Sequence, residues 1–330
     1  MTKAMANRLQ SILGQVISLN QSAFAKGRLI TDNILLAQEL NHYIKNRRNT
    51  KVGYASLNKI DMSKAYDRLE WDFIKQMLLK LGFAREWVDK RGLRQGDPLS
   101  PYIFILSSEW LSMEIEARNR EGALRGISIC QGGPKISHLF FADDCMIYLR
   151  ANTSDFVMLK KILEDYEYLS GQKINLSKSE AFFSPNVQQE CREQLGGILG
   201  IASVQHHSKY LGLPLAVGQR KSDIFRYIID KVWSRVNGWK EKLLSIAGKE
   251  VLIKSVLLAT PLYSMSCFSL PGNVLNKLSS AVYSFWWANV GSDRGIHWVK
   301  KEKLEEEKIK GGLGFKNFKW MNEDLIAKQA

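Results

Sequence analysis

A chain of 330 residues can bury a large core, and its length suggests two domains or one domain with a long appendage. The formal net charge of +14 favours a nucleic-acid partner, since Lys and Arg displace the counterions of a polyanion; a basic surface that only aids solubility is the alternative. Four scattered cysteines argue against a zinc module or a disulfide framework. The chain has no long apolar run and no signal-like start, so we expect an intracellular protein, in the nucleus or cytoplasm.

The first third of the chain predicts helices around one strand. Apolar residues at helical spacing over 5–16 predict an amphipathic helix. A second helix is expected to begin at Asp32, a good N-cap residue, and to run to the basic loop 45–51, which is a solvated turn or a phosphate contact. Residues 54–60 read as a strand that delivers Asp61, and the next helix is expected to end at Gly82.

The middle of the chain predicts a hairpin between two helices. Pro98 and Pro101 bracket the start of a helix, whose expected buried face is Ile103, Leu106, Trp110 and Met113. Two β-prone runs, 136–141 and 145–149, then form a hairpin around Ala142-Asp143-Asp144. A helix follows from Ser154 or Asp155 to Gly171, with an apolar face of Phe156, Leu159, Leu163, Tyr166 and Leu169. Short strands are expected at 173–176 and 181–183.

This order of elements predicts an α+β fold, with an antiparallel sheet covered by helices on one face, up to about residue 185. Helical periodicity at 225–239, 251–258 and 274–287 predicts a mostly helical second region. Six tryptophans and several lysines concentrate there. Such residues at helical spacing are more often core, and stacking on nucleic acid is the alternative.

Three aspartates need a chemical explanation. Asp61 follows a strand, and the Asp143-Asp144 pair lies in a hairpin turn. Nucleotidyl transfer uses two divalent cations, and carboxylates on rigid strands suit Mg²⁺. An Asp-Asp pair alone is expected about once in a chain of this length, and turns favour Asp in any case. Its setting between Phe-Phe-Ala and a β-prone Cys-Met-Ile-Tyr run is what makes the pair informative.

Several segments, in order, resemble the motifs of LINE-type (non-LTR) retroelement reverse transcriptases, and the resemblance covers nearly the whole chain. The polymerase motifs are matched by 59–67, 91–101 and 141–144, and flanking motifs by 20–28 and 171–180. Segments 209–214, 238–240 and 311–315 are similar to the thumb and following region of plant members. The resemblance implies residual fingers and palm-entry helices over 1–52, a palm over 53–185, and a helical thumb and C-terminal extension over 186–330.

The resemblance also implies a metal site and a sugar filter. Asp61 and Asp143 would bridge two Mg²⁺ ions, for which Mn²⁺ can substitute, and Asp144 would be a supporting ligand. Tyr66 would lie under the incoming sugar and exclude a 2′-hydroxyl, with plain packing as the alternative. Asp67 fits a helix N-cap better than a third ligand.

Other residues match substrate-binding positions of the family. Gln95 would line the template and Gly96 would approach the nascent base pair, and both also fit a tight turn. Lys178 would lie near the leaving pyrophosphate, or is a plain exposed lysine. Arg28 would touch template or triphosphate. The implied partners are an RNA template, a DNA primer and deoxynucleoside triphosphates, and no oligomeric state follows.

The chain also departs from the family pattern. A fingers motif resembling Arg-Pro-Ile-Ser-Leu is missing, and Asp89-Lys90 runs directly into Arg91-Gly92, where the family has further palm strands. This junction indicates an internal deletion, a mis-predicted intron or a decayed copy. Lost strands should cost several kcal/mol against a total stability of ~5 to 15 kcal/mol. We therefore expect weak or no polymerase activity. The family's endonuclease, zinc-binding and RNase H parts fall outside this chain.

Three other interpretations stay open. A non-catalytic remnant would bind primer–template in a salt-sensitive way without incorporating nucleotides. Another palm-type nucleotidyl transferase or cyclase would share the acidic positions but should lack the segment 91–98, which this chain has. An RNA-recognition module is disfavoured because its aromatic strand motif is missing.

Overall fold

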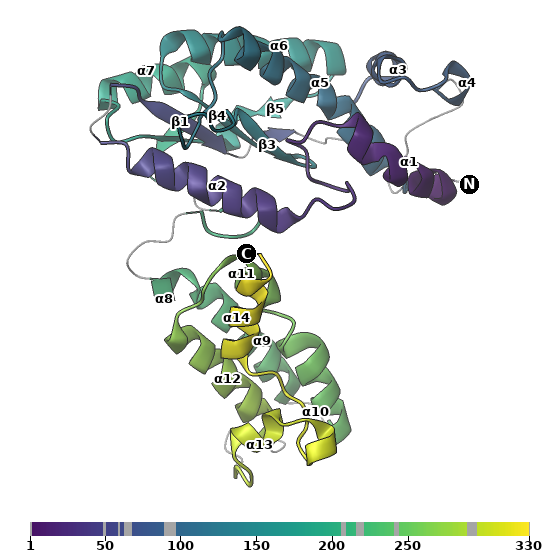
Figure 1. Ribbon diagram of the computed structural model, residues 1–330, viewed down its shortest axis with the longest axis vertical. Coiled ribbons are helices and arrows are strands. Elements are labelled where there is room, and N and C mark those ends of the chain that lie inside the picture. The colour runs from purple at the N-terminus through teal and green to yellow at the C-terminus, as the bar shows by residue number, and fades with distance from the viewer. Residues whose placement is uncertain are drawn as a thin grey trace. The chain divides into compact units, whose positions relative to one another are not determined.

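The computed structural model divides the chain into two compact units, unit 1 (Met1–Ala216) and unit 2 (Val217–Ala330). It describes residues 2–48, 51–58, 60–62, 68–88, 97–205, 209–215, 221–240, 244–288 and 296–329. Within this part of the chain, all strands belong to unit 1, and the regular elements of unit 2 are helical (Figure 1). No described helix is long and apolar enough to cross a membrane.

The elements of unit 1 alternate between helices and short strands. The helices are α1 (Thr2–Val16), α2 (Ile30–Lys45), α3 (Trp71–Lys80), α4 (Arg85–Val88), α5 (Ser100–Glu121), α6 (Thr153–Ser170), the 3-10 turn η1 (Leu176–Lys178) and α7 (Gln189–Leu199). The strands are β1 (Tyr54–Asn58), β2 (Asp61–Met62), β3 (His138–Phe141), β4 (Asp144–Arg150), β5 (Ile174–Asn175), β6 (Glu180–Phe183) and β7 (Ala202–Val204).

The main sheet of unit 1 has the strand order β3-β4-β1-β6-β7. Neighbouring strands are antiparallel except β6 and β7, which run parallel. Strand β1 lies at the centre, and all five of its residues are buried. The strands β2 and β5 form a separate antiparallel pair. The predicted α+β fold built on an antiparallel sheet is therefore confirmed.

Helices cover both faces of this sheet (Figure 1). Ala55 and Leu57 of β1 belong to the core cluster that includes residues of α5, α6 and α7, which is the expected helical layer. Tyr54 points to the other face and packs with Leu40 and Ile44 of α2. Successive side chains of a strand point to opposite faces, so a central strand buried on both faces needs both layers. The expectation of helices on one face is therefore incomplete.

The start of α2 differs from the prediction. The helix begins at Ile30, with Leu29 at the N-cap position, so the expectation that Asp32 is the N-cap is wrong. Asp32 lies three residues inside the helix, where its carboxylate accepts a hydrogen bond from the backbone N–H of Leu29 at 3.3 Å. A carboxylate at this position still satisfies an unpaired amide and favours the positive end of the helix dipole.

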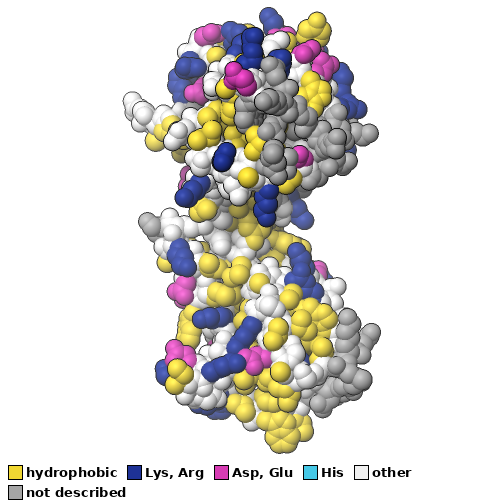
Figure 2. Space-filling model, turned by 90° about the vertical axis from the view of Figure 1, so that its right-hand side faces the viewer, with side chains coloured by type: hydrophobic (Ala, Val, Ile, Leu, Met, Phe, Trp, Pro, Cys, Tyr) yellow, Lys and Arg dark blue, Asp and Glu magenta, His cyan; other side chains and the backbone are white. Residues whose placement is uncertain are grey.

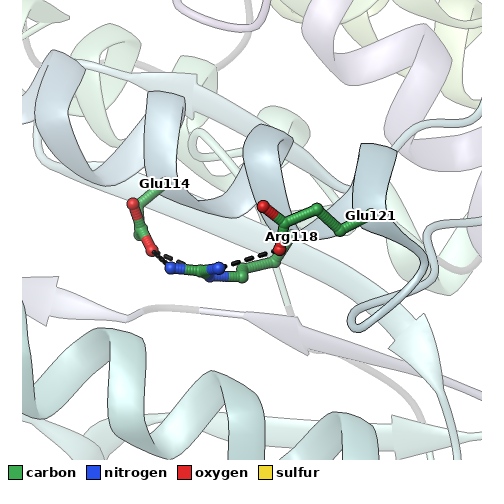
Figure 3. Close-up of polar contacts among 3 residues, drawn as sticks. All are labelled: Glu114, Arg118 and Glu121. Carbon is green, nitrogen blue, oxygen red and sulfur yellow. Dashed lines mark hydrogen bonds and ion pairs between the residues drawn. The ribbon is translucent and has the colours of Figure 1, made fainter.

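Helix α5 buries a different stripe from the one predicted. Ile103 and Leu106 are buried as expected, but Met113 is 54% exposed. The buried positions of the second half of the helix are Leu111, Ser112 and Ile115, so Met113 points away from the core. At its exposed end Arg118 pairs with Glu114 and Glu121, one turn away on either side (Figure 3). These pairs raise the pKa of Arg118, first through the hydrogen bond that its guanidinium donates to Glu121.

Helix α6 begins and ends near the predicted residues. The side chain of Asn152 accepts a hydrogen bond from Asp155 N at 2.8 Å and caps the first turn. Gly171 ends the helix with φ +73, and a Cβ there would meet Arg68 O at 2.7 Å, so both the backbone and the space require glycine. Leu169 is 43% exposed rather than buried, because the helical period leads from Tyr166 to the buried Ser170.

Unit 2 is a helical bundle, as predicted. Its elements are α8 (Lys221–Ile224), α9 (Arg226–Lys240), α10 (Ile246–Leu252), the π-helix η2 (Ile253–Leu257), α11 (Leu262–Cys267), α12 (Gly272–Trp287), α13 (Lys301–Glu305), the 3-10 turn η3 (Lys308–Lys310) and α14 (Phe318–Ala327). Pro261 and Pro271 occupy the N-cap positions of α11 and α12, which explains why they interrupt the helical pattern.

A buried asparagine joins α14 to the loop after α11. Asn322 is 3% exposed, and its side-chain NH₂ donates to Met265 O at 2.9 Å and to Phe268 O at 2.8 Å. Its side-chain oxygen accepts from Leu270 N at 2.8 Å. One side chain therefore satisfies three backbone groups where α11 ends.

The tryptophans of unit 2 do not form a plain core. Trp298 and Trp320 are 76% and 65% exposed, and the other four are half-buried. Hydrophobic side chains and Lys or Arg side chains lie side by side on one face of unit 2 (Figure 2). The core interpretation therefore holds for part of this set only.

The split between the two units does not coincide with the division at 185 and 186 expected from the resemblance. Helix α7 packs against α6, and β7 pairs with β6, so the chain continues in unit 1 up to residue 216. The names fingers, palm and thumb for 1–52, 53–185 and 186–330 stay predictions.

Candidate active site

The predicted hairpin is confirmed and presents two aspartates at its tip. Phe141 of β3 lies opposite Asp144 of β4, which leaves Ala142 and Asp143 as the two residues of the turn. Both aspartates are exposed, while Cys145 next to them is 2% exposed. Ala142 has φ +54, in the left-handed region that costs a residue with a Cβ about 1–2 kcal/mol. The turn therefore holds carboxylates at the surface of a buried frame.

The backbone of Asp61 approaches this turn. Leu57 of β1 lies opposite Ile147 of β4, so the end of β1 runs toward the β3–β4 turn. The segment after β1 still contacts β4 beyond the regular ladder, because Ile60 N donates a hydrogen bond to Cys145 O at 3.5 Å. Asp61 itself opens β2 and pairs with Asn175 of β5. The direction of the Asp61 side chain lies outside what the structure describes.

A third segment brings Lys178 to the same end of the sheet. Asn175 lies opposite Asp61, and the 3-10 turn that follows ends at Lys178, whose side chain is exposed. Glu180, two residues later, lies opposite Asn58 at the end of β1. The predicted acid and lysine positions therefore come from neighbouring strand ends.

Three predicted substrate-binding residues lie outside the described residues. Tyr66 belongs to the stretch 63–67, and Gln95 and Gly96 belong to the stretch 89–96, neither of which the structure describes. Asp67 and the junction at Lys90-Arg91 fall in the same stretches. The roles expected for these residues stay predictions.

Arg28 is engaged with the backbone of its own loop. Its guanidinium donates to Ser18 O and Gln21 O through Nη1, and to Gly14 O at 3.2 Å and Ile17 O through Nη2. These carbonyls lie at the end of α1 and in the loop after it, so Arg28 closes that loop on itself. A contact between Arg28 and template or triphosphate stays a prediction.

Sequence reasoning missed the residues that support the hairpin from the side. The loop after α1 runs along the free edge of β3: Phe140 N donates to Asn20 O at 2.8 Å, and Ser22 N donates to Phe140 O at 3.1 Å. Asn33 of α2 also donates to Phe140 O, at 3.0 Å. The segment 20–28 matches a family motif, but nothing in its sequence shows that this loop would pair with the edge of β3.

A buried polar network lies behind this loop. Glu109 of α5 accepts hydrogen bonds from Ser18 N at 2.8 Å and Ser18 Oγ at 3.4 Å, and burial raises the pKa of Glu109 to about 7. Ser18 Oγ lies 2.8 Å from Ser112 Oγ, which lies 2.7 Å from Nε2 of His138. Burial lowers the pKa of His138 to about 3, so this imidazole is neutral.

The carboxylate of Asp144 affects the pKa of its buried neighbour, Cys145. The pKa of the Cys145 thiol is raised well above its usual value, mainly by burial and then by the neighbouring Asp144 carboxylate. Among the described side chains, no group of three or more His, Cys, Asp or Glu residues is arranged to hold a metal ion. Asp61, the third predicted ligand, is not among those side chains.

A family model described as reverse transcriptase (RNA-dependent DNA polymerase) matches residues 1–215, which is more than half of the chain. The chain belongs to the reverse transcriptase family. The matched stretch contains the sheet, the β3–β4 turn and every predicted site residue. It ends within one residue of the boundary of unit 1.

Curated relatives specify the class of reverse transcriptase. The chain is 25% identical to the transposon TX1 uncharacterized 149 kDa protein of Xenopus laevis, over 94% of this chain and 25% of that protein. It is 22% identical to a Pol polyprotein from a type-2 retrotransposable element of Drosophila melanogaster, over 96% of this chain and 31% of that protein. A putative ribonuclease H protein of Arabidopsis thaliana is 39% identical over 35% of this chain and 19% of its own length.

These names confirm the resemblance to LINE-type, non-LTR reverse transcriptases. The chain spans about a fifth to a third of the length of these relatives. The activities of the whole polyproteins are therefore separate from what this stretch shows.

Proposed function

We propose that the chain is the RNA-directed DNA polymerase part of a non-LTR retrotransposon, and that it extends a DNA primer along an RNA template from deoxynucleoside triphosphates. One observation carries the proposal: two strand ends, each with an aspartate that the sequence predicts as a metal ligand, lie close to each other. Asp143 occupies the exposed turn of β3–β4, and the backbone before Asp61 contacts β4 one residue beyond Asp144. Polymerase chemistry needs carboxylates from separate strands held on a rigid frame.

The donor set fits a pair of Mg²⁺ ions. Asp143 and Asp144 offer carboxylate oxygens at the surface, and Asp61 would supply the third carboxylate from β2. Oxygen ligands are those that Mg²⁺ prefers, and Mn²⁺ accepts the same set. When bound, two such ions activate the attacking hydroxyl and neutralise charge on the leaving pyrophosphate. The chain's own part is to hold these oxygens near one another.

The remaining predicted residues would serve the substrate. Lys178, exposed at the end of η1, would place positive charge where the pyrophosphate leaves and could give it a proton. Tyr66 would exclude a ribose 2′-hydroxyl, and Gln95 and Gly96 would line the template and nascent base pair. These roles rest on the family resemblance alone.

A second candidate function is a catalytically inactive remnant that still binds nucleic acid. The alignment with the Xenopus laevis protein runs over 340 residues, although this chain has only 330 and 94% of them are used. That protein therefore has residues between matched segments that this chain lacks. An internal deletion, such as the one expected before Arg91, would give this pattern, and that expected deletion is the reason for expecting weak or no synthesis.

Primer extension on an RNA template tests the proposal. We expect at most weak incorporation of deoxynucleotides, dependent on Mg²⁺, that disappears in Asp143→Asn. Asp165→Asn, an exposed aspartate of α6, is the matched control and should match the unmodified chain. Robust synthesis that needs Asp143 would refute the expected weakness. Synthesis that survives Asp143→Asn would refute the assigned centre.

Binding measurements separate the two candidates. The polymerase and the remnant should both bind primer–template duplex less tightly as salt rises, because both carry the basic charge. Only the polymerase should couple that binding to incorporation. Salt-sensitive binding with no incorporation at any Mg²⁺ or Mn²⁺ concentration would favour the remnant.

A further inference from the structure

The β3–β4 turn is held by a side chain that has no assigned role. Gln21 lies in the loop after α1 and forms an isolated parallel bridge with Phe140 of β3. Its side-chain oxygen accepts a hydrogen bond from the backbone N–H of Ala142 at 3.2 Å. Ala142 is the turn residue that directly precedes Asp143. Gln21 therefore reaches from the loop to a backbone amide of the turn, one residue before the exposed carboxylate.

The hydrogen bond to Ala142 N stabilises a backbone conformation that is unfavourable for alanine. Ala142 has φ +54, and a residue with a Cβ adopts this conformation only when its surroundings hold it. The turn itself is only two residues long, so a change of φ at Ala142 would redirect Asp143. The hydrogen bond from Ala142 N to Gln21 is the interaction that the structure describes for this amide.

The accepting oxygen is itself held in place. Gln21 is 1% exposed, and its side-chain oxygen also accepts from Ala23 N at 3.0 Å, which fixes the side chain against its own loop. Ser22 Oγ donates to Asn33 Oδ1 at 2.6 Å, and Arg28 Nη1 donates to Gln21 O. The loop is therefore anchored to α2 and to the end of α1 on both sides of Gln21.

The nitrogen of the Gln21 side-chain amide does not contact the turn in this way. Nε2 of Gln21 is buried without a hydrogen-bond partner among the described residues. A buried donor left unpaired destabilises a fold, so this nitrogen does not explain why a glutamine lies here. The carbonyl oxygen is what distinguishes glutamine from methionine here, and that oxygen contacts the turn.

We propose that Gln21 is a positioning residue, whose side-chain oxygen fixes the Ala142 backbone and so aims Asp143. The inference rests on the proposed polymerase function for its consequence, since Asp143 matters there as a metal ligand. Its geometric core, that Gln21 sets the turn, can be measured with no metal or substrate present.

The amide of Ala142 can be observed directly. The sequence contains three Phe-Ala pairs, Phe24-Ala25, Phe83-Ala84 and Phe141-Ala142, so labelling Phe with ¹³C at the carbonyl and Ala with ¹⁵N selects three amides. Ala142→Gly removes one signal and assigns it. In Gln21→Met we expect hydrogen exchange at Ala142 to rise about tenfold, the change expected from losing one hydrogen bond of about 1.4 kcal/mol. Exchange at Ala84, which lies outside this loop, should stay unchanged.

A matched variant separates positioning from loss of stability. Gln38 of α2 also has a buried Nε2 without a partner among the described residues, so Gln38→Met makes the same chemical change away from the turn. It should leave all three amides unchanged. Unchanged exchange at Ala142 in Gln21→Met, or an equal rise at all three amides, would overturn the proposal.

Titration of the same proteins with Mn²⁺ adds the functional consequence. The difference between the unmodified chain and Asp143→Asn defines the Asp143-dependent binding, and Gln21→Met should weaken it by about three- to tenfold. Ala142→Gly in the Gln21→Met background should restore part of this affinity, since glycine adopts positive φ without cost. Faster exchange at Ala142 with unchanged Mn²⁺ affinity would overturn the positioning role.

Failure of the proposed function has a different signature. If Asp143→Asn binds Mn²⁺ as the unmodified chain does, the assigned metal centre is wrong. The exchange at Ala142 would still decide whether Gln21 holds the turn.

Discussion

The β3–β4 turn of unit 1 and the outer surface of unit 2 expose opposite kinds of side chain. At the turn, Asp143 and Asp144 are exposed next to Cys145, which is 2% exposed. In unit 2, Trp298 and Ile296 are 76% and 66% exposed. The first region places charge on a rigid support, and the second places large apolar groups in water.

The two regions also differ in which groups their buried hydrogen bonds hold in place. The edge of β3 is bonded by backbone and side chains of the loop after α1 and of α2, so the turn cannot shift freely. In unit 2 the buried asparagine Asn322 bonds the backbone where α11 ends. Rigid support at an exposed acid is what a metal site requires, whereas buried bonds in unit 2 serve the bundle.

The largest expected loss of stability comes from removing the buried side chain of Asn322 in unit 2. Asn322→Ala leaves two carbonyls and one N–H without their partner, so we expect the free energy of unfolding of unit 2 to fall by about 3 kcal/mol. Six of the nine tryptophans belong to unit 2, so urea unfolding followed by tryptophan fluorescence reports mainly on this unit. The matched control is Asn273→Ala, whose contact with Ser222 is exposed and should matter little. Equal losses in both variants would contradict the prediction.

The polar network behind the turn should make unit 1 sensitive to pH. Burial raises the pKa of Glu109 to about 7, while an unfolded glutamate titrates near 4.5. Between these values the folded state holds a proton that the unfolded state releases, so the free energy of unfolding falls as pH rises through this window. From the shift, the loss is on the order of 3 kcal/mol at most.

Glu109→Gln should remove this loss. A glutamine can still accept from Ser18 N and carries no charge, so the variant should gain stability relative to the unmodified chain as pH rises from 5 to 8. His138 acts in the opposite direction: its pKa falls to about 3, so its contribution is complete above pH 6.5 and is lost at lower pH. His138 is present in both proteins, so the difference between their urea-unfolding curves isolates Glu109. Parallel curves across this range would show that Glu109 titrates normally.

The sequence was sufficient for the hairpin and for most helices. Two β-prone apolar runs on either side of Ala142-Asp143-Asp144 predicted the strands, and the glycines at 82 and 171 both have positive φ at helix ends. The errors at Met113 and Leu169 have one cause. Helical spacing defines a stripe, but which stripe faces the core depends on the neighbouring sheet and helices, which the spacing does not describe.

For the candidate site, the sequence pointed to the acidic residues but not to the residues that hold them in place. Asp61 and Asp143 stay predictions from the motif, and the contact from Ile60 N to Cys145 O brings their backbones to one end of the sheet. Gln21 could not be assigned a role, because its partner, Ala142 N, lies 121 residues further along the chain. Contacts of this kind depend on the tertiary fold and leave no periodic pattern in the sequence.

The smallest expected change in stability comes from the exposed surface of unit 2. Trp298→Ala removes a side chain that is 76% exposed, so the free energy of unfolding should change by no more than about 0.5 kcal/mol. The two alternatives for these tryptophans then diverge. A tryptophan that stacks on a base should lower affinity for single-stranded RNA by about 1–3 kcal/mol when removed, and a purely structural one should leave affinity unchanged. Fluorescence anisotropy with a labelled oligonucleotide measures this affinity, and Trp320→Ala, 65% exposed on α14, tests whether any such effect is confined to Trp298. A loss of stability without a loss of affinity would instead return Trp298 to the core interpretation.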